Sequence, residues 1–254
     1  MSAPASNMRS LDRAFDVLTV LQSTKHPLRL AEVARSSELH IATAQRILGV
    51  LVHRGYAART ADGYTAGPAA LAVAHAFMVT NPLSVLAQPI MQQLASSTGF
   101  TASLYVRVEH SRVLIARVES ENPLSYVLPV GERLPLHLGG AGKMFLAGLP
   151  PEEVDSVLAD VAGATVAGGG ALDVDLLRRQ LEVIARDDYA VSVGERLVGI
   201  ASVTAPVRAR GSDVVAVLGV TGSSDRLNGD AVSSVVAEVR RAATTLGDRI
   251  PPAG

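Results

Sequence analysis

Within the first 66 residues, apolar positions recur at helical spacing up to residue 53, and two short β-prone runs follow at 56–60 and 64–66. The spacing predicts three helices, over residues 11–21, 30–34 and 41–53. Ser10 is a candidate N-cap for the first of them. The pair Asp62-Gly63 separates the β-prone runs and predicts a hairpin turn. Helices followed by a hairpin in this order are typical of a winged helix-turn-helix.

The third predicted helix has one apolar face and one small or polar face. Side chains that fall together on the apolar face, at about 100° per residue, are expected in the core: Ala44, Ile47, Leu48 and Leu51. The opposite face carries Ala42, Arg46, Gly49 and His53, with Thr43 and Gln45 on its flanks. Such a face fits a DNA major groove, where Gln45 can pair with adenine and Arg46 with guanine or a phosphate. We therefore expect this helix to read double-stranded operator DNA.

Further candidate DNA contacts surround this helix. They are Arg9, Arg13 and Arg35 on the helices, Thr43 at the start of the third helix, and Arg59 and Thr60 beside the hairpin turn. Any one arginine alone could be an ordinary solvated charge, so the prediction depends on the group. Residues 1–80 contain eight basic and five acidic residues, whereas the remainder contains fifteen and nineteen. This asymmetry is typical of a polyanion-binding module joined to a different module.

The pattern changes at Pro68 and again at Asn81-Pro82. Residues 69–79 are apolar on most sides, which predicts a linker helix with a dimer surface, or alternatively a helix packed on the first domain. Helices are then predicted over 83–97, 141–149, 151–159, 173–187 and 230–247. Strands are predicted over 102–108, 113–118, 125–129, 200–208 and 213–222, with a tight polar turn at 109–112 and a mobile Gly- and Ala-rich loop at 161–171. Hairpins separated by helices favour an α+β fold with an antiparallel sheet.

These patterns divide the chain into four parts. We expect a disordered tail over 1–7, a winged helix-turn-helix over 8–67, a linker helix over 68–81 and a second domain over 82–254. The absence of cysteine excludes disulfides, thiolate zinc sites and cysteine nucleophiles, and fits a reducing cytoplasm. The sequence shows no signal-peptide pattern and no apolar run long enough to span a bilayer, so we expect a cytoplasmic protein without membrane contacts.

Several segments resemble the IclR-type regulators. The first domain matches at residues 9–18 (RSLDRAFDVL), 30–35 (LAEVAR) and 43–48 (TAQRIL), and at the Gly-Tyr pairs 55–56 and 63–64. The second domain matches at 135–137 (PLH), 140–143 (GAGK), 188–195 (DYAVSVGE), 199–207 (GIASVTAPV) and 218–222 (LGVTG). The resemblance covers almost the whole chain in order. It implies a DNA-binding domain, a linker helix and a GAF-like effector domain, assembled as dimers that often pair into tetramers.

The chain departs from the family pattern at two places in the first domain. The family usually opens its recognition helix with Pro-Lys-Ser, where this chain has His40, Ile41 and Ala42. The Thr that commonly caps the second helix is Arg29 here. The change at 40–42 removes a phosphate contact and alters the base-reading surface, so the operator of a relative does not transfer to this chain.

The resemblance also implies an effector pocket in the second domain. Its matched positions are Tyr126, Leu128, Gly140, Ala141, Ser192, Glu195, Ile200, Ser202, Gly219 and Thr221. Relatives carry Asp at the position of Ser192 and Cys at that of Ser202, and Gly219 is expected to leave room at the pocket floor. Independently, Gly140 and Ala141 begin a predicted helix whose N–H groups favour an anion. We expect a small carboxylate effector, an organic or aromatic acid.

Enzyme motifs are absent from the sequence. The run 139–144 resembles a phosphate loop, but that pattern needs Gly at the position of His137 and Ser or Thr at that of Met144. No dinucleotide-binding, hydrolase nucleophile-elbow or zincin motif occurs. The histidines are scattered, so no metal and no cofactor is predicted; His137 is interpreted as structural, and Lys143 as a surface charge or ion-pair partner. Two alternatives to a ligand-responsive regulator remain: a DNA-binding protein whose second domain only oligomerises, and a small-molecule enzyme with a DNA-binding module.

Overall fold

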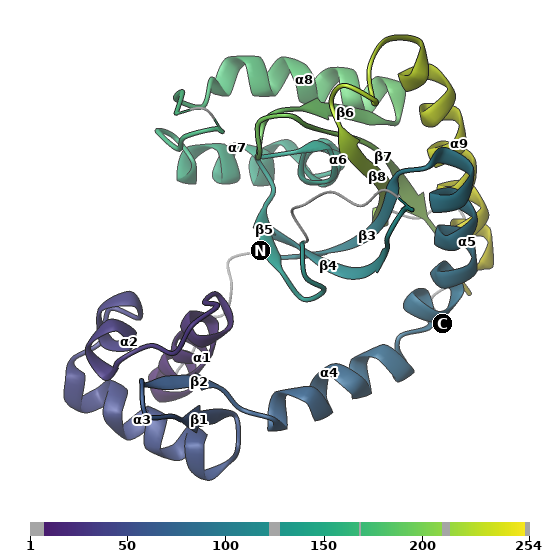
Figure 1. Cartoon of the computed structure of the whole chain (residues 1–254). Helices are drawn as coiled ribbons and strands as arrows, with labels where there is room; N and C mark the ends of the chain where they lie inside the picture. The colour runs from purple at the N-terminus through teal and green to yellow at the C-terminus, as the bar shows by residue number, and fades with distance from the viewer. Residues whose placement is uncertain (1–7, 122–127, 168, 210–213, 252–254) are drawn as a thin grey trace. The chain divides into compact units, whose positions relative to one another are not determined.

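The computed structural model describes residues 8–121, 128–167, 169–209 and 214–251 (Figure 1). The expected tail over 1–7 therefore lies outside the described residues. Contacts divide the chain into two compact units, Met1–Asn81 and Pro82–Gly254. Each unit has its own hydrophobic core.

The first unit is a winged helix-turn-helix. Its elements are α1 (Arg9–Gln22), α2 (Leu30–Ser36), α3 (Ile41–His53), β1 (Ala57–Arg59), β2 (Tyr64–Ala66) and α4 (Ala69–Thr80). Val17, Leu21 and Leu48 centre its core. The predicted cap at Ser10 is wrong, because α1 begins after Met8 and has no side-chain cap. At α2 the backbone N–H of Arg29 donates to the Glu32 carboxylate at 2.7 Å, which secures the helix start without a Thr.

Helix α4 is apolar on most sides, yet none of its side chains is buried in the described structure. Leu71 is 72% exposed, and Val73, Phe77, Met78 and Val79 are also exposed. The alternative that this helix packs on the first domain is therefore wrong. Among the described residues no single helix is long and apolar enough to cross a membrane; only α4 and α5 joined across the break at Asn81 reach the required length and composition.

The second unit is built on one antiparallel six-stranded sheet in the order β5-β4-β3-β8-β7-β6. Its strands are β3 (Thr101–Val108), β4 (Ser111–Val118), β5 (Arg133–Pro135), β6 (Ala190–Val193), β7 (Ile200–Arg208) and β8 (Val214–Ser223). Its helices are α5 (Pro82–Thr98), α6 (Gly140–Ala147), α7 (Pro151–Asp160), α8 (Val174–Asp187) and α9 (Gly229–Arg249). The α+β fold with an antiparallel sheet is thus confirmed.

Helices cover both faces of this sheet (Figure 1). Helices α5 and α9 lie side by side on one face, where Val235, Val239 and Leu246 pack on the sheet. Helices α6, α7 and α8 cover part of the opposite face and form a second apolar cluster around Leu136 and Leu146. Beside that cluster the same face of the sheet carries polar side chains, and this is where the pocket lies.

Three details of the second unit differ from the sequence predictions. The predicted strand 125–129 lies mostly outside the described residues, and the strand found beside β4 is instead Arg133–Pro135. Strand β6 was not predicted, since its four residues are too few for a periodic signal. The predicted polar turn at 109–112 is two residues shorter: β4 begins at Ser111, and Arg112 is a buried strand residue.

Candidate DNA interface and effector pocket

Helix α3 presents the predicted recognition face to solvent. Ala44, Leu48 and Leu51 are buried and Ile47 is half-buried, which confirms the predicted core face. On the other side Ala42, Gln45, Arg46, Gly49 and His53 are exposed, and Thr43 is half-buried. The fold therefore leaves this face unobstructed by any described residue of its own unit, as base reading in a major groove requires.

Three of the predicted DNA contacts lie together beside this face. Arg13 of α1 and Thr43 and Arg46 of α3 line one hollow of about 260 Å³ between the two helices. The rest of its wall is mostly apolar, with Ile47 and Val50 contributing from α3. The structure therefore joins α1 and α3 into one surface that combines guanidinium groups with apolar contacts.

The remaining predicted contacts are exposed but separate from that hollow. Arg9 lies on α1 and Arg35 on α2. In the wing, the Thr60 hydroxyl donates to the Gly63 carbonyl at 3.2 Å, so it stabilises the turn, and the Arg59 guanidinium lies 6.0 Å from the centre of the Tyr64 ring. These residues line no shared hollow with Arg46 among the described pockets.

Eight of the ten predicted effector residues line one cavity of about 50 Å³ in the second unit. They are Gly140, Ala141, Ser192, Glu195, Ile200, Ser202, Gly219 and Thr221. Leu128 lines a smaller adjoining cavity of about 20 Å³ that shares Ile200 and Thr221 with the first. Tyr126 lies outside the described residues.

Strand alternation explains why the pocket is polar. Successive side chains of a strand point to opposite faces. In β3 Ala102 and Leu104 therefore pack under α5 and α9, whereas Ser103 and Tyr105 line the pocket. Strands β7 and β8 repeat the pattern with Ser202, Thr204 and Thr221 on the pocket side. The hydroxyl groups thus gather on one part of one sheet face.

Arg112 of β4 lies at this pocket and is only 3% exposed. Its Nη1 donates to the Pro135 carbonyl, and its guanidinium carbon lies 5.6 Å from the centre of the Tyr105 ring. Burial lowers the pKa of Arg112 to about 10, so the group still carries its charge at neutral pH. Sequence reasoning missed this residue, because the polar turn predicted at 109–112 includes it.

An ion pair between a buried lysine and a partly exposed glutamate lies at the helical side of the pocket. The Lys143 ammonium of α6, 2% exposed, pairs with the Glu195 carboxylate and also donates to Gln180 of α8 at 3.1 Å. The other Glu195 oxygen accepts from the Gly139 backbone N–H at 3.0 Å. Of the two interpretations of Lys143, ion-pair partner is confirmed and surface charge is wrong. The anion at the start of α6 is thus the chain's own Glu195, which also neutralises Lys143.

Two further pocket predictions change in the structure. A Cβ at Gly219 would lie 2.6 Å from the Val203 carbonyl oxygen and would also collide with Thr204, so this glycine permits close strand packing rather than simply enlarging the floor. His137 is buried, and its Nδ1 has no partner among the described residues. Burial, and secondarily the Arg112 charge, lower the pKa of His137 below its ordinary value, so its imidazole is neutral at neutral pH.

Ser103, Tyr105, Arg112 and Thr204 are pocket residues that the sequence prediction omitted. Their signal was available as alternation of apolar and polar residues in the predicted strands, as at 101–105. That alternation is equally typical of a sheet face turned to water, so it does not reveal that these polar groups are buried. Within the described ranges, no group of three potential metal ligands occurs.

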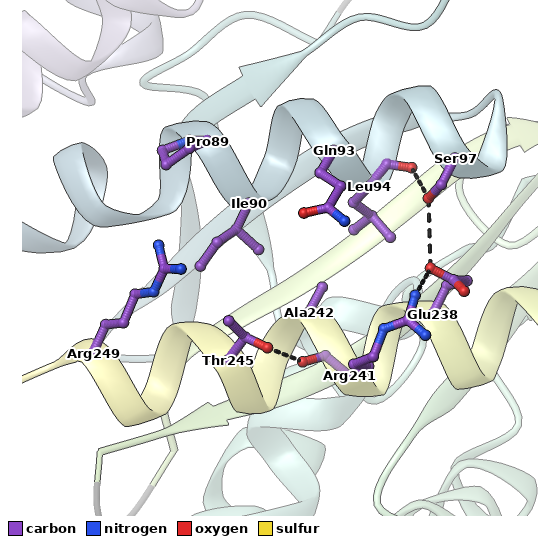
Figure 2. Close-up of a pocket in the computed structure, with 10 residues that line it drawn as sticks. All are labelled: Pro89, Ile90, Gln93, Leu94, Ser97, Glu238, Arg241, Ala242, Thr245 and Arg249. Atoms are coloured by element: carbon purple, nitrogen blue, oxygen red, sulfur yellow. Dashed lines mark hydrogen bonds and ion pairs between the residues drawn. The ribbon is translucent and has the colours of Figure 1, made fainter.

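A larger groove of about 170 Å³ runs between α5 and α9 on the other face of the sheet. Figure 2 shows Ile90 and Leu94 of α5 facing Ala242 of α9 across it. At one end Glu238 pairs with Arg241 and accepts from the Ser97 hydroxyl at 3.5 Å (Figure 2). The groove contains none of the predicted site residues, and its acidic side chain is already paired.

The fold and these two sites define a transcriptional regulator with a helix-turn-helix and an effector domain. Residues 10–61 match the family model of the IclR helix-turn-helix domain, and residues 75–247 match that of the bacterial transcriptional regulator IclR C-terminal domain. The chain therefore belongs to the IclR family, as the sequence motifs indicated.

Curated relatives match along nearly their whole length. The HTH-type transcriptional regulator BhcR of Paracoccus denitrificans is 27% identical over 98% of this chain and 89% of that protein. The HTH-type transcriptional repressor AllR of Escherichia coli is 26% identical, covering 96% and 92%. Their names indicate a DNA-binding rather than an enzymatic role for the family members that this chain resembles.

Solved structures share the fold. An IclR transcriptional regulator from Alicyclobacillus acidocaldarius superposes with a TM-score of 0.81 at 23% identity, covering 95% of this chain and 98% of that one. An IclR homologue from Microbacterium hydrocarbonoxydans, solved with 4-hydroxybenzoate, gives 0.74 at 24% identity, covering 94% and 97%. At this identity the likeness shows the fold alone.

Proposed function

We propose that this chain is a ligand-responsive regulator that binds a palindromic operator as a dimer and responds to a small carboxylate in the pocket of its second unit. The observation that carries the proposal is the exposed face of α3, where Gln45 and Arg46 project beside small Ala42 and Gly49. A helix of this composition can approach base edges closely in a major groove. Arg9, Arg13, Arg35, Arg59 and Thr60 would hold the DNA backbone.

Helix α4 supports the dimeric part of the proposal. Helices that are apolar on all sides are normally buried, yet its side chains are exposed in the single chain. Pairing of two copies through this helix would bury Leu71 and Phe77 and bring two winged units to one DNA. Two-fold symmetry of the protein would then require a two-fold repeat in the operator.

The pocket supports the effector part of the proposal. It is concave, lined by hydroxyl groups, and carries Arg112 beside Glu195, whose charge Lys143 already neutralises. Such a site favours a polar anion over a neutral or cationic ligand. The 4-hydroxybenzoate held by the Microbacterium relative is a carboxylate of the same general class. Binding would bias the placement of the two winged units through α4.

The test is operator binding by the purified full chain. We expect fluorescence anisotropy to show tighter binding to the DNA upstream of its own gene than to a random duplex of equal length. Arg46→Ala should weaken that specific binding by about 10- to 100-fold per half-site with an unchanged Tm, since one good base contact is worth roughly 1–3 kcal/mol.

Arg54→Ala is the matched control, because Arg54 is exposed just after the end of α3 and is not on the predicted face. Equal binding of the two duplexes by the unaltered chain would reject the regulator proposal. Equal loss in both variants would reject only the assignment of the recognition face.

A further inference from the structure

Arg112 is a buried cation without a counter-ion among the described residues. Arg112 forms no ion pair within the described parts of the chain, although it is almost fully buried. Its only described hydrogen bond runs from Nη1 to the Pro135 carbonyl, while Nε is buried without a partner. Buried guanidinium groups are normally paired with an anion, because removing a charge from water is costly.

The carboxylate that lines the same pocket does not form an ion pair with Arg112. Glu195 lies on the same pocket wall, but its two oxygens are engaged by the Lys143 ammonium and by the Gly139 N–H. Arg196 also lines the pocket and places a second guanidinium near Arg112, which disfavours the charged form of Arg112. Glu195 favours the charged form of Arg112 only at a distance, as no ion pair joins the two among the described residues.

Two glycines allow the backbone to lie close to the Arg112 guanidinium. A Cβ on Gly142 would collide with Nη1 of Arg112 and with the Leu136 carbonyl, and a Cβ on Gly139 would lie 3.3 Å from Nη2. Glycine at these two positions therefore lets the start of α6 approach Arg112. The edge formed by Nε and Nη2 has no hydrogen-bond acceptor among the described residues, and this edge has the geometry that binds a carboxylate with two hydrogen bonds.

We propose that Arg112 is the residue that binds the carboxylate of the effector, and that the size of the cavity admits only a short acid. This inference rests on the proposed function and assigns its ligand contact. The cavity of about 50 Å³ holds only a few water-sized groups, since one such group needs about 10–15 Å³. Ser192, Ser202 and Thr221 line the same cavity and would bond a hydroxyl or keto oxygen.

The experiment is thermal unfolding of the full chain with defined probes at constant ionic strength. Glycolate, lactate and pyruvate are the carboxylates, lactamide is the neutral counterpart of lactate, and 4-hydroxybenzoate is the larger acid. We expect at least one short carboxylate to raise the Tm, because a ligand bound only by the folded state stabilises it. Lactamide should not, and 4-hydroxybenzoate should act more weakly than the best short acid.

Arg112→Met should reduce the affinity for that carboxylate by about 10- to 100-fold, the range for hydrogen bonds to charged groups. Its Tm without ligand should equal or exceed that of the unaltered chain, since an unpaired buried charge is removed. Arg107→Met is the matched control, because Arg107 pairs directly across from Arg112 in the β3–β4 register but is ion-paired with Glu153. This control should respond to the carboxylate like the unaltered chain.

Three results would overturn the inference: no short carboxylate stabilises the unaltered chain, lactamide acts as well as lactate, or Arg112→Met keeps the full response. If Arg112→Met fails to fold, Arg112→Lys takes its place. Lysine keeps the charge but cannot offer two parallel N–H groups to a carboxylate, so an undiminished affinity would overturn the assignment. Operator binding separates the two proposals. If Arg112→Met binds the operator and keeps its full response to the carboxylate, only the assignment of Arg112 is rejected. If the unaltered chain does not bind the operator, the proposed regulator function is rejected.

Discussion

The two units of this protein place their functional polar groups in opposite environments. In the winged unit, Gln45 and Arg46 are exposed on a helix that is anchored by its other face. In the second unit, Arg112, Lys143 and Ser192 are buried inside the fold. A polar group in water can be replaced with little effect on stability, whereas a buried one is coupled to its partners. Substitutions on the first surface should therefore reduce function without reducing stability. In the second unit a substitution at the paired Lys143 should reduce stability, whereas one at Arg112, which has no ion pair among the described residues, should not.

The largest expected effect breaks the buried pair in the second unit. Lys143→Met keeps the length of the side chain but leaves Glu195 without its cation. Because removing one partner of a buried pair leaves an uncompensated charge, we expect the free energy of unfolding to fall by about 3 kcal/mol, measured by urea denaturation of this unit.

The double variant Lys143→Met/Glu195→Gln is the control for that substitution. The glutamine oxygen can still accept from the Gly139 N–H, so the double variant should recover most of the lost stability. If the two substitutions were simply additive, Lys143 would be stabilising through packing and not through its charge.

Helix periodicity shows why the winged unit was the more predictable of the two. The whole of α3, its buried face and its exposed face follow from spacing within thirteen residues. The pocket instead joins residues far apart in the chain: Lys143 and Glu195 meet across 52 positions, and Arg112 meets the start of α6. The family resemblance located eight pocket residues by position, but no local pattern shows that Arg112 or Thr204 turns inward.

The next effect concerns the exposed apolar helix α4 at the end of the first unit. Phe77→Glu places a charge in the proposed dimer surface of α4, and we expect the dimer to weaken at least tenfold, since an unpaired charge would be buried on association. Light scattering with size-exclusion chromatography measures the mass. Val108→Glu is the matched control, because both side chains are 42% exposed and Val108 lies on β3. An unchanged dimer in Phe77→Glu would place the interface elsewhere.

A smaller effect separates stability from function on α3. A Cβ at Gly49 would meet nothing within 4 Å, so the fold itself does not require glycine there. Gly49→Ala should raise the free energy of unfolding of the winged unit by about 1 kcal/mol through helix propensity. If DNA approaches this position closely, operator affinity should fall at the same time. Stabilisation with unchanged DNA binding would show that no such approach occurs.

The smallest expected effect is the pH dependence of stability that buried His137 contributes. The pKa of His137 is lowered by burial and by the Arg112 charge, so the unfolded chain binds a proton more readily than the folded one. Stability should therefore be complete above the ordinary histidine pKa of about 6.5 and should decline as the pH falls below it. His137→Gln should make the Tm less dependent on pH between about 7.5 and 5. The exposed His26→Gln should not change this dependence, and an equal flattening in both variants would assign it to another group.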